Sequence, residues 1–122
     1  MMAKRPLVSV VDDSESVRES LPHLLRVLGY SVRAFSSAEE FFASDCVGRT
    51  RCLIFDITRP GMTGLDLQQR LTVLRQEIPT IYITAQAEET VRPYLLERGA
   101  VECLFKPFSD TALLRALKAA LK

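Results

Sequence analysis

The chain has 122 residues, of which 48% are hydrophobic and 25% charged, and its formal net charge is +1. This length fits one domain, residues 1–122, that buries about two-thirds of the surface of its unfolded chain. The balanced charge gives no support to binding of nucleic acid or of an anionic membrane surface. No apolar stretch approaches the roughly 20 residues that span a bilayer, so we expect a cytoplasmic protein without membrane contact.

The cysteines and the single histidine point away from a disulfide framework or a zinc site. Cys46, Cys52 and Cys103 are odd in number and have no CxxC spacing, which indicates reduced thiols. His23 lies among leucines at helical spacing and has no partner at metal-ligand spacing. We therefore expect His23 to be a partly exposed helical residue.

Five short segments indicate β-strands, and helix-like segments separate them. Continuous apolar runs are typical of strands buried on both faces of a parallel sheet, and an alternating segment is typical of a half-buried strand. The predicted strands are Leu7–Val11, Ser31–Phe35, Cys52–Phe55, Ile81–Ile83 and Val101–Phe105.

Capping signals, apolar spacing and glycine stops mark the helices. Ser16 with Glu19, and Ser37 with Glu40, form capping-box patterns, and Ser109 is placed to cap the last helix. The first predicted helix covers Val17–Leu28, has Pro22 inside it and is followed by Gly29. The second carries Phe41 and Phe42, and the third has its apolar face at Leu65, Leu71 and Leu74. The fourth is Glu88–Arg98, with Pro93 near its start, and the fifth has Leu113, Leu114, Leu117 and Leu121 on its inner face. Five β-α units predict an α/β three-layer sandwich with right-handed crossovers.

Chemically active side chains gather at the carboxyl ends of these strands. Asp12 and Asp13 follow the first strand, Asp56 the third, Thr84 the fourth and Lys106 the fifth. In an open α/β sheet the ligand crevice lies beyond the carboxyl ends of the strands. The sequence therefore predicts three carboxylates, a hydroxyl and an ammonium around one crevice, which suits a divalent cation and a phosphoryl group.

Short motifs in the same order resemble the receiver domains of two-component response regulators. They are Val11-Asp12-Asp13, Asp56, Pro60-Gly61-Met62-Thr63-Gly64-Leu65, Ile83-Thr84-Ala85 and Lys106-Pro107-Phe108. The resemblance covers essentially the whole chain and implies a flavodoxin-like fold, with five helices and a five-stranded parallel sheet in the order 2-1-3-4-5. Asp56–Leu65 and Lys106-Pro107-Phe108 most resemble receivers of regulators with a LuxR-type helix-turn-helix output.

This family resemblance implies a magnesium site. Three carboxylates in one place repel one another and raise one another's pKa unless a cation lies among them. Mg²⁺ binds one or two carboxylates, keeps several waters and accepts a phosphate oxygen. The resemblance implies that Asp13 and Asp56 bind it directly with the backbone carbonyl of Thr58, and that Asp12 acts mainly through a water.

The same resemblance makes Asp56 the phosphoacceptor. Its carboxylate would attack the phosphorus of a phosphohistidine on a sensor histidine kinase and form an acyl phosphate. Lys106 would neutralise the phosphoryl oxygens, and the Thr84 hydroxyl and the Ala85 N–H would donate hydrogen bonds to them. The bond between Lys106 and Pro107 resembles a cis peptide of the family, which would aim the ammonium inward.

The family's switched surface is formed by the fourth helix, the fifth strand and the fifth helix, and it often serves as a homodimer interface. Cys103 stands where the family has an aromatic residue on the fifth strand, and Arg59 stands where it usually has an apolar one. Phe105 lies on the same side of the strand as Cys103, so it is a candidate to replace that aromatic.

The sequence favours a signalling receiver, not an enzyme, that takes part in its own Mg²⁺-dependent phosphorylation and dephosphorylation. Its output is expected to be transcription, through a DNA-binding domain absent from this chain. One alternative is a receiver-like interaction module that does not use phosphorylation, which Cys103 and Arg59 favour. Another is a phosphatase with a phospho-Asp56 intermediate, which usually has a second acid where this chain has Thr58.

Overall fold

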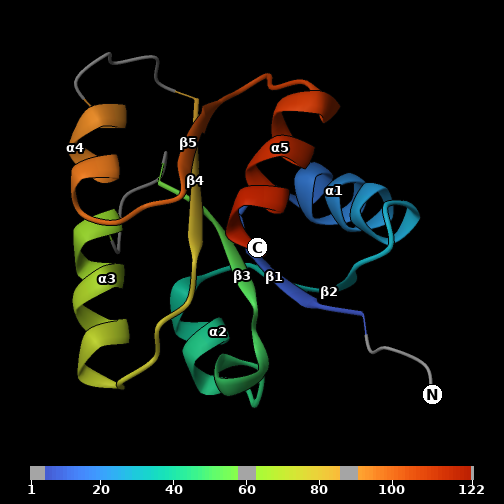
Figure 1. Ribbon diagram of the computed structural model, residues 1–122. Helices are drawn as coiled ribbons and strands as arrows, with labels where there is room; N and C mark the ends of the chain where they lie inside the picture. Colours follow the sequence, from blue (N-terminus) through green and yellow to red (C-terminus); the bar gives the residue numbers. More distant parts are fainter. Residues whose placement is uncertain (1–4, 58–62, 86–90, 122) are drawn as a thin grey trace.

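The computed structural model describes residues 5–57, 63–85 and 91–121, and strands and helices alternate through these ranges (Figure 1). The strands are β1 Leu7–Val11, β2 Ser31–Phe35, β3 Cys52–Asp56, β4 Thr80–Thr84 and β5 Glu102–Phe105. The helices are α1 Glu15–Val27, α2 Ala38–Ala43, α3 Gly64–Val73, α4 Val91–Glu97 and α5 Asp110–Ala120, and a short 3₁₀ helix, η1, covers Val47–Arg49.

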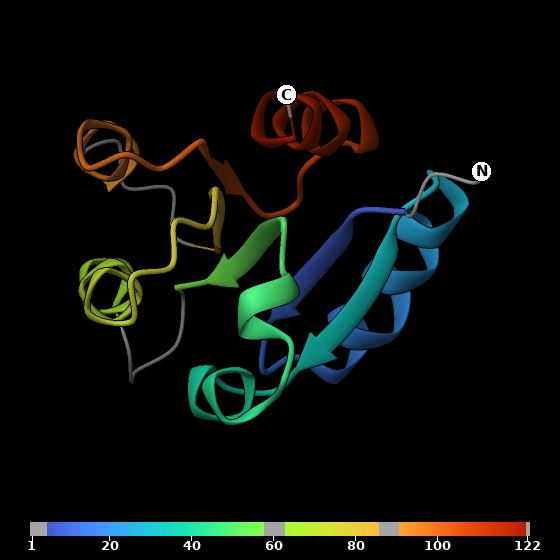
Figure 2. The same ribbon diagram turned by 60° about the horizontal axis from the view of Figure 1, so that its bottom comes forward.

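The strands form one parallel sheet in the order β2-β1-β3-β4-β5. Helices α1 and α5 cover one face of this sheet, and α2, α3 and α4 cover the other (Figures 1 and 2). The prediction of a flavodoxin-like three-layer sandwich is therefore confirmed. None of the helices in the described ranges combines the length and the apolar character needed to cross a membrane.

The central strands are apolar at successive positions because both of their faces are buried. In β3, Leu53 and Phe55 belong to the core on the side of α2, α3 and α4, while Cys52 and Ile54 belong to the core on the side of α1 and α5. β2 lies at the edge, and its residue Arg33 is exposed to solvent. This difference explains why the central strands read as continuous apolar runs and β2 as an alternating one.

Helix α1 begins earlier than the capping pattern predicts. Ser14, not Ser16, precedes the first helical residue, and its N–H donates to Asp12 Oδ1 at 2.8 Å. Ser16 lies inside the helix with its hydroxyl 3.1 Å from that of Ser14, so the prediction of a cap at Ser16 was wrong. Because the chain turns at Ser14, directly after the acidic residues that follow β1, the helix begins two residues before the start that the Ser16 pattern predicts. The helix is continuous through Pro22, and His23 is exposed on it.

The other predicted caps are present at least in part. The hydroxyl of Ser37 accepts the N–H of Glu40 at 3.1 Å, and that of Ser109 accepts the N–H of Ala112 at 3.0 Å. Within the described ranges, a capping box with both of its hydrogen bonds lies at the start of α3, between Thr63 and Asp66. It was not predicted from the sequence. The Thr-x-x-Asp spacing was the available signal for it.

One detail of the predicted core differs from the structure. Leu71 is buried on α3, but Leu74 is 44% exposed because the helix ends at Val73 and Leu74 only caps it. The side chain of Leu65 lies outside the described residues. Cys46, Cys52 and Cys103 are all free and buried.

A buried chain of hydroxyls joins β1 to the segment before β3. The Thr50 hydroxyl donates to the carbonyl of Cys46 at 2.7 Å, and the Ser9 hydroxyl lies 2.7 Å from Thr50 Oγ1. We expect Thr50→Val to lower the free energy of unfolding by about 1 kcal/mol, because it leaves the buried Ser9 hydroxyl without its acceptor. Urea denaturation measures this loss. Ser9→Ala, which leaves the bond from Thr50 to Cys46 intact, should cost less, and an equal cost would contradict the prediction.

Candidate functional site

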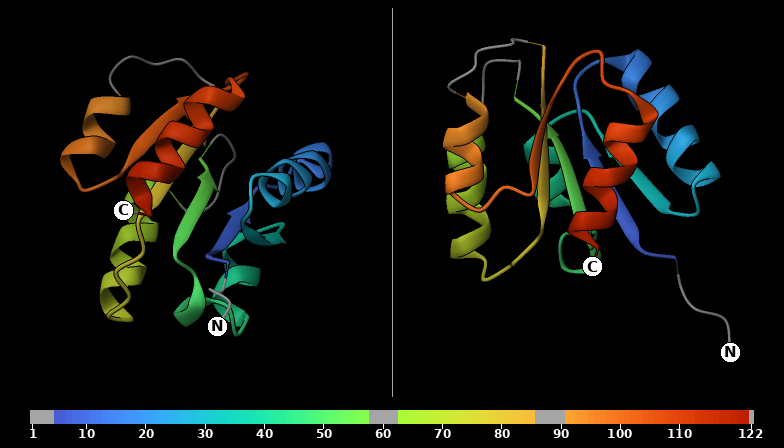
Figure 3. Two further views of the ribbon diagram at one scale, coloured as in Figure 1. Left: turned by 45° about the vertical axis from the view of Figure 1, so that its right-hand side comes forward. Right: turned by 45° about the horizontal axis from the view of Figure 1, so that its top comes forward.

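The site lies at the carboxyl edge of the sheet, which Figure 3 (right) brings toward the viewer where β4 and β5 end. Asp12 directly follows β1, Asp56 is the last residue of β3, and Lys106 directly follows β5. β1 and β3 are neighbours, and Val11 and Phe55 are register partners. The carboxylates that follow these two strands are therefore brought side by side, as the sequence predicts.

Three carboxylates form one cluster at this edge. One carboxylate oxygen from each of Asp12, Asp13 and Asp56 lies within 4.8 Å of the others. Asp12 is buried, Asp13 is exposed, and Asp56 is intermediate between them. Oxygen ligands in this number, with one side open to solvent, suit a hard divalent cation that keeps several waters.

The Lys106 ammonium bridges two of these carboxylates. Lys106 Nζ donates to Asp12 Oδ2 at 3.1 Å and to Asp56 Oδ2 at 3.0 Å. The two carboxylate side chains are 0% and 5% exposed and the lysine side chain is 24% exposed. The peptide bond between Lys106 and Pro107 is cis, and the Lys106 N–H donates to the Thr84 carbonyl at 2.8 Å. The end of β5 is thereby fixed beside the end of β4.

The electrostatics of the cluster favour additional positive charge. Burial raises the pKa of Asp12; the hydrogen bonds from Ser14 and Lys106 oppose this rise, and the charge of Asp56 adds to it. Burial would lower the pKa of Lys106, but its hydrogen bonds to Asp56 and Asp12 outweigh burial and raise it. The Lys106 ammonium bridges two of the three clustered carboxylates, so a further cation beside the cluster would relieve the repulsion among them.

Arg18, which the sequence did not single out, fixes the backbone of the segment that follows β1. Arg18 Nη1 on α1 donates to the backbone carbonyl of Asp12 at 2.9 Å. Together with the bond from the Ser14 N–H, it fixes the backbone and the carboxylate of Asp12 from two directions. Its position one turn into the helix that follows the acidic pair was the available signal.

The remaining predicted site residues are placed as follows. Thr84 is buried at the end of β4, and Ala85 follows it and is exposed. Asp56 is the register partner of Ile83, so the ends of β3 and β4 are neighbours and Thr84 lies close to the acidic cluster along the sheet. Thr58, the predicted backbone ligand, and Arg59 lie outside the described residues.

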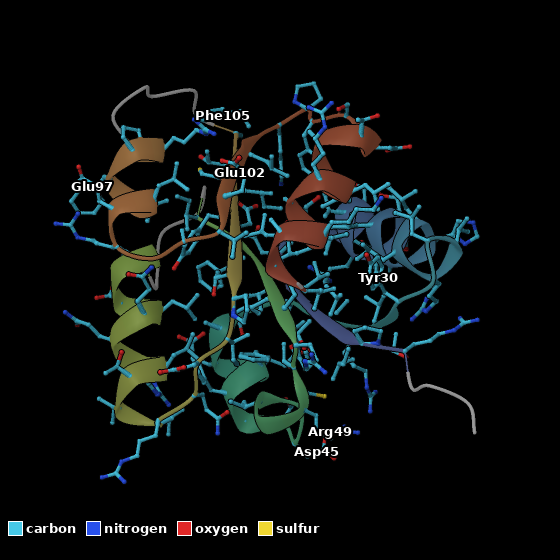
Figure 4. All side chains as sticks on the ribbon, viewed as in Figure 1. Tyr30, Asp45, Arg49, Glu97, Glu102 and Phe105 are labelled. Atoms are coloured by element: carbon cyan, nitrogen blue, oxygen red, sulfur yellow. The ribbon has the colours of Figure 1, made fainter. Side chains whose placement is uncertain are left out.

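The aromatic ring at the level of Cys103 comes from the neighbouring strand. Cys103 is buried, and its register partner on β4 is Tyr82, which is fully buried on the same face of the sheet. The Tyr82 hydroxyl donates to the carbonyl of Gly64 at 3.1 Å, and burial raises the pKa of this tyrosine. Phe105 is half-buried and is the register partner of Thr84, and Figure 4 shows it at the end of β5. Whether it replaces the missing aromatic stays a prediction.

An ion pair joins α4 to β5 on this surface. Arg92 Nε lies 2.8 Å from Glu102 Oε1. Burial would raise the pKa of Glu102, but the hydrogen bonds from Arg92 and from the Cys103 N–H, with the charge of Arg92, lower it below its ordinary value.

We expect Arg92→Gln to lower the free energy of unfolding at pH 7 by about 0.5 kcal/mol, since both partners are partly exposed to solvent. The contribution of a carboxylate with a lowered pKa is present above the pKa of the unfolded chain and is lost as the pH falls through the folded pKa. The difference between wild type and variant should therefore begin to shrink near pH 4.5, the ordinary pKa of Glu102, and vanish once the pH lies below its lowered folded-state pKa. Urea denaturation across pH tests this, with Glu97→Gln on exposed α4 as the control; a difference that persists in acid would contradict it.

Comparisons with known proteins agree with this geometry. The family model of the response regulator receiver domain matches residues 8–118. Nodulation protein W of Bradyrhizobium diazoefficiens is 41% identical over 95% of this chain and 51% of its own length. Response regulator protein TodT of Pseudomonas putida is 37% identical over 100% of this chain and 54% of its own length.

The fold has close counterparts among solved structures. The crystal structure of FixJ-N superposes with a TM-score of 0.83 at 34% identity, over 98% of this chain and 95% of that one. The chain spans about half the length of the curated relatives described above. Because the family model covers nearly all of the chain, the chain belongs to the response regulator receiver domains of two-component systems.

Proposed function

We propose that this receiver accepts a phosphoryl group on Asp56 from a sensor histidine kinase in the presence of Mg²⁺. The observation that carries the proposal is the bridge from Lys106 Nζ to the carboxylates of Asp12 and Asp56, at 3.1 and 3.0 Å, inside a cluster of three carboxylates. This arrangement combines a nucleophilic carboxylate with a fixed positive charge, and phosphoryl transfer needs chiefly these two and correct positioning.

In the transfer step, a carboxylate oxygen of Asp56 forms the new bond to phosphorus while the bond from phosphorus to the histidine nitrogen breaks. The electron pair of that bond stays on the imidazole, which leaves, and an acyl phosphate remains on Asp56. Lys106 carries positive charge to the equatorial oxygens, and the Thr84 hydroxyl and the Ala85 N–H are the proposed hydrogen-bond donors to them.

The donor set fits Mg²⁺. Asp13 and Asp56, with the carbonyl of Thr58, are the proposed direct ligands, and Asp12 is proposed to act through a water. When bound, the ion supplies further positive charge to the phosphoryl oxygens. Asp12 also holds Lys106 in place, which orients the ammonium toward Asp56.

The proposed output is regulation of transcription. The Rhizobium meliloti protein FixJ, 36% identical over 93% of this chain, is called a transcriptional regulatory protein, and this chain covers 55% of it. We infer that phosphorylation changes the surface of α4, β5 and α5, that this surface supports a homodimer, and that any contact with DNA belongs to an output domain outside this chain. A cytoplasmic location remains a prediction.

Intact-mass spectrometry after incubation with acetyl phosphate and Mg²⁺ tests the proposal. We expect one added phosphoryl group on the wild type, none when Mg²⁺ is replaced by a chelator, and none on Asp56→Asn. Asp45→Asn, which changes an exposed aspartate away from the cluster, is the matched control and should be modified like the wild type.

One observation favours a second candidate, an interaction module that does not use phosphorylation. Tyr82 is fixed by its hydrogen bond to Gly64 beside the small Cys103, so this face has no large side chain from β5 at that level. Absence of an adduct with both acetyl phosphate and a phosphorylated histidine kinase, together with failure to bind Mg²⁺ in calorimetry, would replace the phosphoacceptor proposal with this one.

A further inference from the structure

The opposite end of the sheet carries a pocket with a concentration of positive charge. A cavity of about 520 Å³ opens beside the amino ends of the strands and is lined by Arg5, Pro6, Leu7, Ser31, Arg49 and Arg51. None of these lining residues is acidic, although the whole chain has 16 basic and 15 acidic residues. Positive charge is therefore gathered here, not spread evenly.

The sheet register holds this pocket together. β1 lies between β2 and β3, so the residues that enter these three strands are neighbours although they are far apart in sequence. The Ser31 N–H donates to the carbonyl of Pro6 at 3.0 Å, and the Arg51 N–H donates to the carbonyl of Leu7 at 2.8 Å. The backbone of the pocket is thus fixed by hydrogen bonds on both sides of the start of β1.

The guanidinium groups of the pocket are poorly neutralised by the protein itself. Arg49 pairs with Asp45 at 3.4 Å, and both side chains are largely exposed, at 60% and 84% (Figure 4). Within the described ranges, no carboxylate lies within ion-pairing distance of Arg5 or Arg51. Like charges around one concavity repel, and an anion placed among them removes that repulsion.

We propose that this pocket binds a small molecule that carries adjacent phosphate groups, of the pyrophosphate or nucleoside diphosphate class. Guanidinium groups bind phosphate oxygens in pairs with charge-assisted hydrogen bonds, and the Ser31 hydroxyl is a further donor on the rim. The volume falls in the range of small-molecule sites, about 300–1,000 Å³. The pocket lies at the end of the sheet away from Asp12, Asp13 and Asp56, so we expect a ligand there to leave phosphorylation of Asp56 unchanged.

Isothermal titration calorimetry with inorganic pyrophosphate, in a chelating buffer without Mg²⁺, tests the site. We expect saturable binding of one pyrophosphate per chain, weakened about tenfold in Arg51→Gln and further in Arg5→Gln with Arg51→Gln, because each change removes one guanidinium fork. Arg115→Gln on α5, also an exposed arginine, removes the same charge outside the pocket and should bind like the wild type.

The other outcomes separate this site from general charge attraction and from the receiver chemistry. Absence of saturable binding, or equal weakening by Arg115→Gln, would overturn the proposal. Tighter binding of duplex DNA than of pyrophosphate or ADP, lost in Arg51→Gln, would also overturn it and assign the pocket to nucleic acid. Acetyl phosphate labelling of Arg51→Gln should equal that of the wild type, so loss of one function leaves the other measurable.

Discussion

Lys106→Met is expected to lower the free energy of unfolding by about 3 kcal/mol at pH 7 in the absence of Mg²⁺. The change removes the ammonium that lies 3.1 and 3.0 Å from the carboxylates of Asp12 and Asp56, whose side chains are 0% and 5% exposed. Breaking a buried pair on one side leaves uncompensated charge, and this costs about 3–5 kcal/mol in other proteins. The partial exposure of the lysine places the expected cost at the lower end of that range.

The pH dependence of this loss identifies its cause. Burial already raises the pKa of Asp12 in the wild type, and the hydrogen bond from Lys106 opposes this rise, so removal of the ammonium raises this pKa further. The variant should therefore recover stability relative to wild type as the pH falls and Asp12 takes up a proton. Urea denaturation followed by circular dichroism at pH 7 and pH 5 measures the change. Lys118→Met, at an exposed position of α5, is the control and should unfold like the wild type. Equal midpoints for Lys106→Met and wild type at pH 7 would show that the bridge does not stabilise the fold.

Gly64→Ala is expected to cost about 2 kcal/mol of stability, because added atoms in a packed core force neighbours away from their positions. A Cβ at Gly64 would lie 2.9 Å from Leu95 Cδ2 and 3.1 Å from Tyr82 Cε1. Leu95 is 3% exposed and Tyr82 0%, so neither side chain has open space to move into. The first turn of α3 would have to move away from β4, which weakens the bond from the Tyr82 hydroxyl to the Gly64 carbonyl.

Gly48→Ala provides the matched control for this prediction. A Cβ at Gly48 meets nothing within 4 Å, so the same substitution there adds no contact. Thermal and urea unfolding of both variants compare them directly. If Gly64→Ala unfolds at the same urea concentration as Gly48→Ala, the close approach of α3 to β4 does not limit the side chain at residue 64.

The sequence pattern predicts the elements well where burial decides the pattern. β1 and β2 have the predicted bounds, β3 and β5 differ by one residue at one end, and β4 is longer by one residue at each end. The order of the strands came from the family resemblance, because runs of apolar residues in parallel strands do not distinguish one neighbour from another. The start of α1 was wrong by two residues, since the Asp12 carboxylate turns the chain at Ser14 and a local pattern at Ser16 does not include that contact.

For the site, too, local sequence patterns predict some features, and tertiary contacts decide the others. Residue types at strand ends predicted which side chains gather, and the structure brings Asp12, Asp13, Asp56 and Lys106 together. The unequal burial of the carboxylates, the bridge made by Lys106 and the contact of Arg18 depend on side-chain packing across three elements. The arginine pocket depends in addition on strand register, which places Arg5 and Arg51 beside each other from segments that no local pattern connects.

The order of the sheet has a consequence for behaviour at high protein concentration. β2 and β5 are the outer strands, and each has a row of backbone groups that could pair with a strand of another molecule. Arg33 is an exposed charge on β2, and Glu102, held by Arg92, is a charge on the four-residue β5. Pairing of β2 with β2, or of β5 with β5, of another molecule would bring like charges together and remove water from them. These two side chains therefore oppose self-pairing of either edge of the sheet.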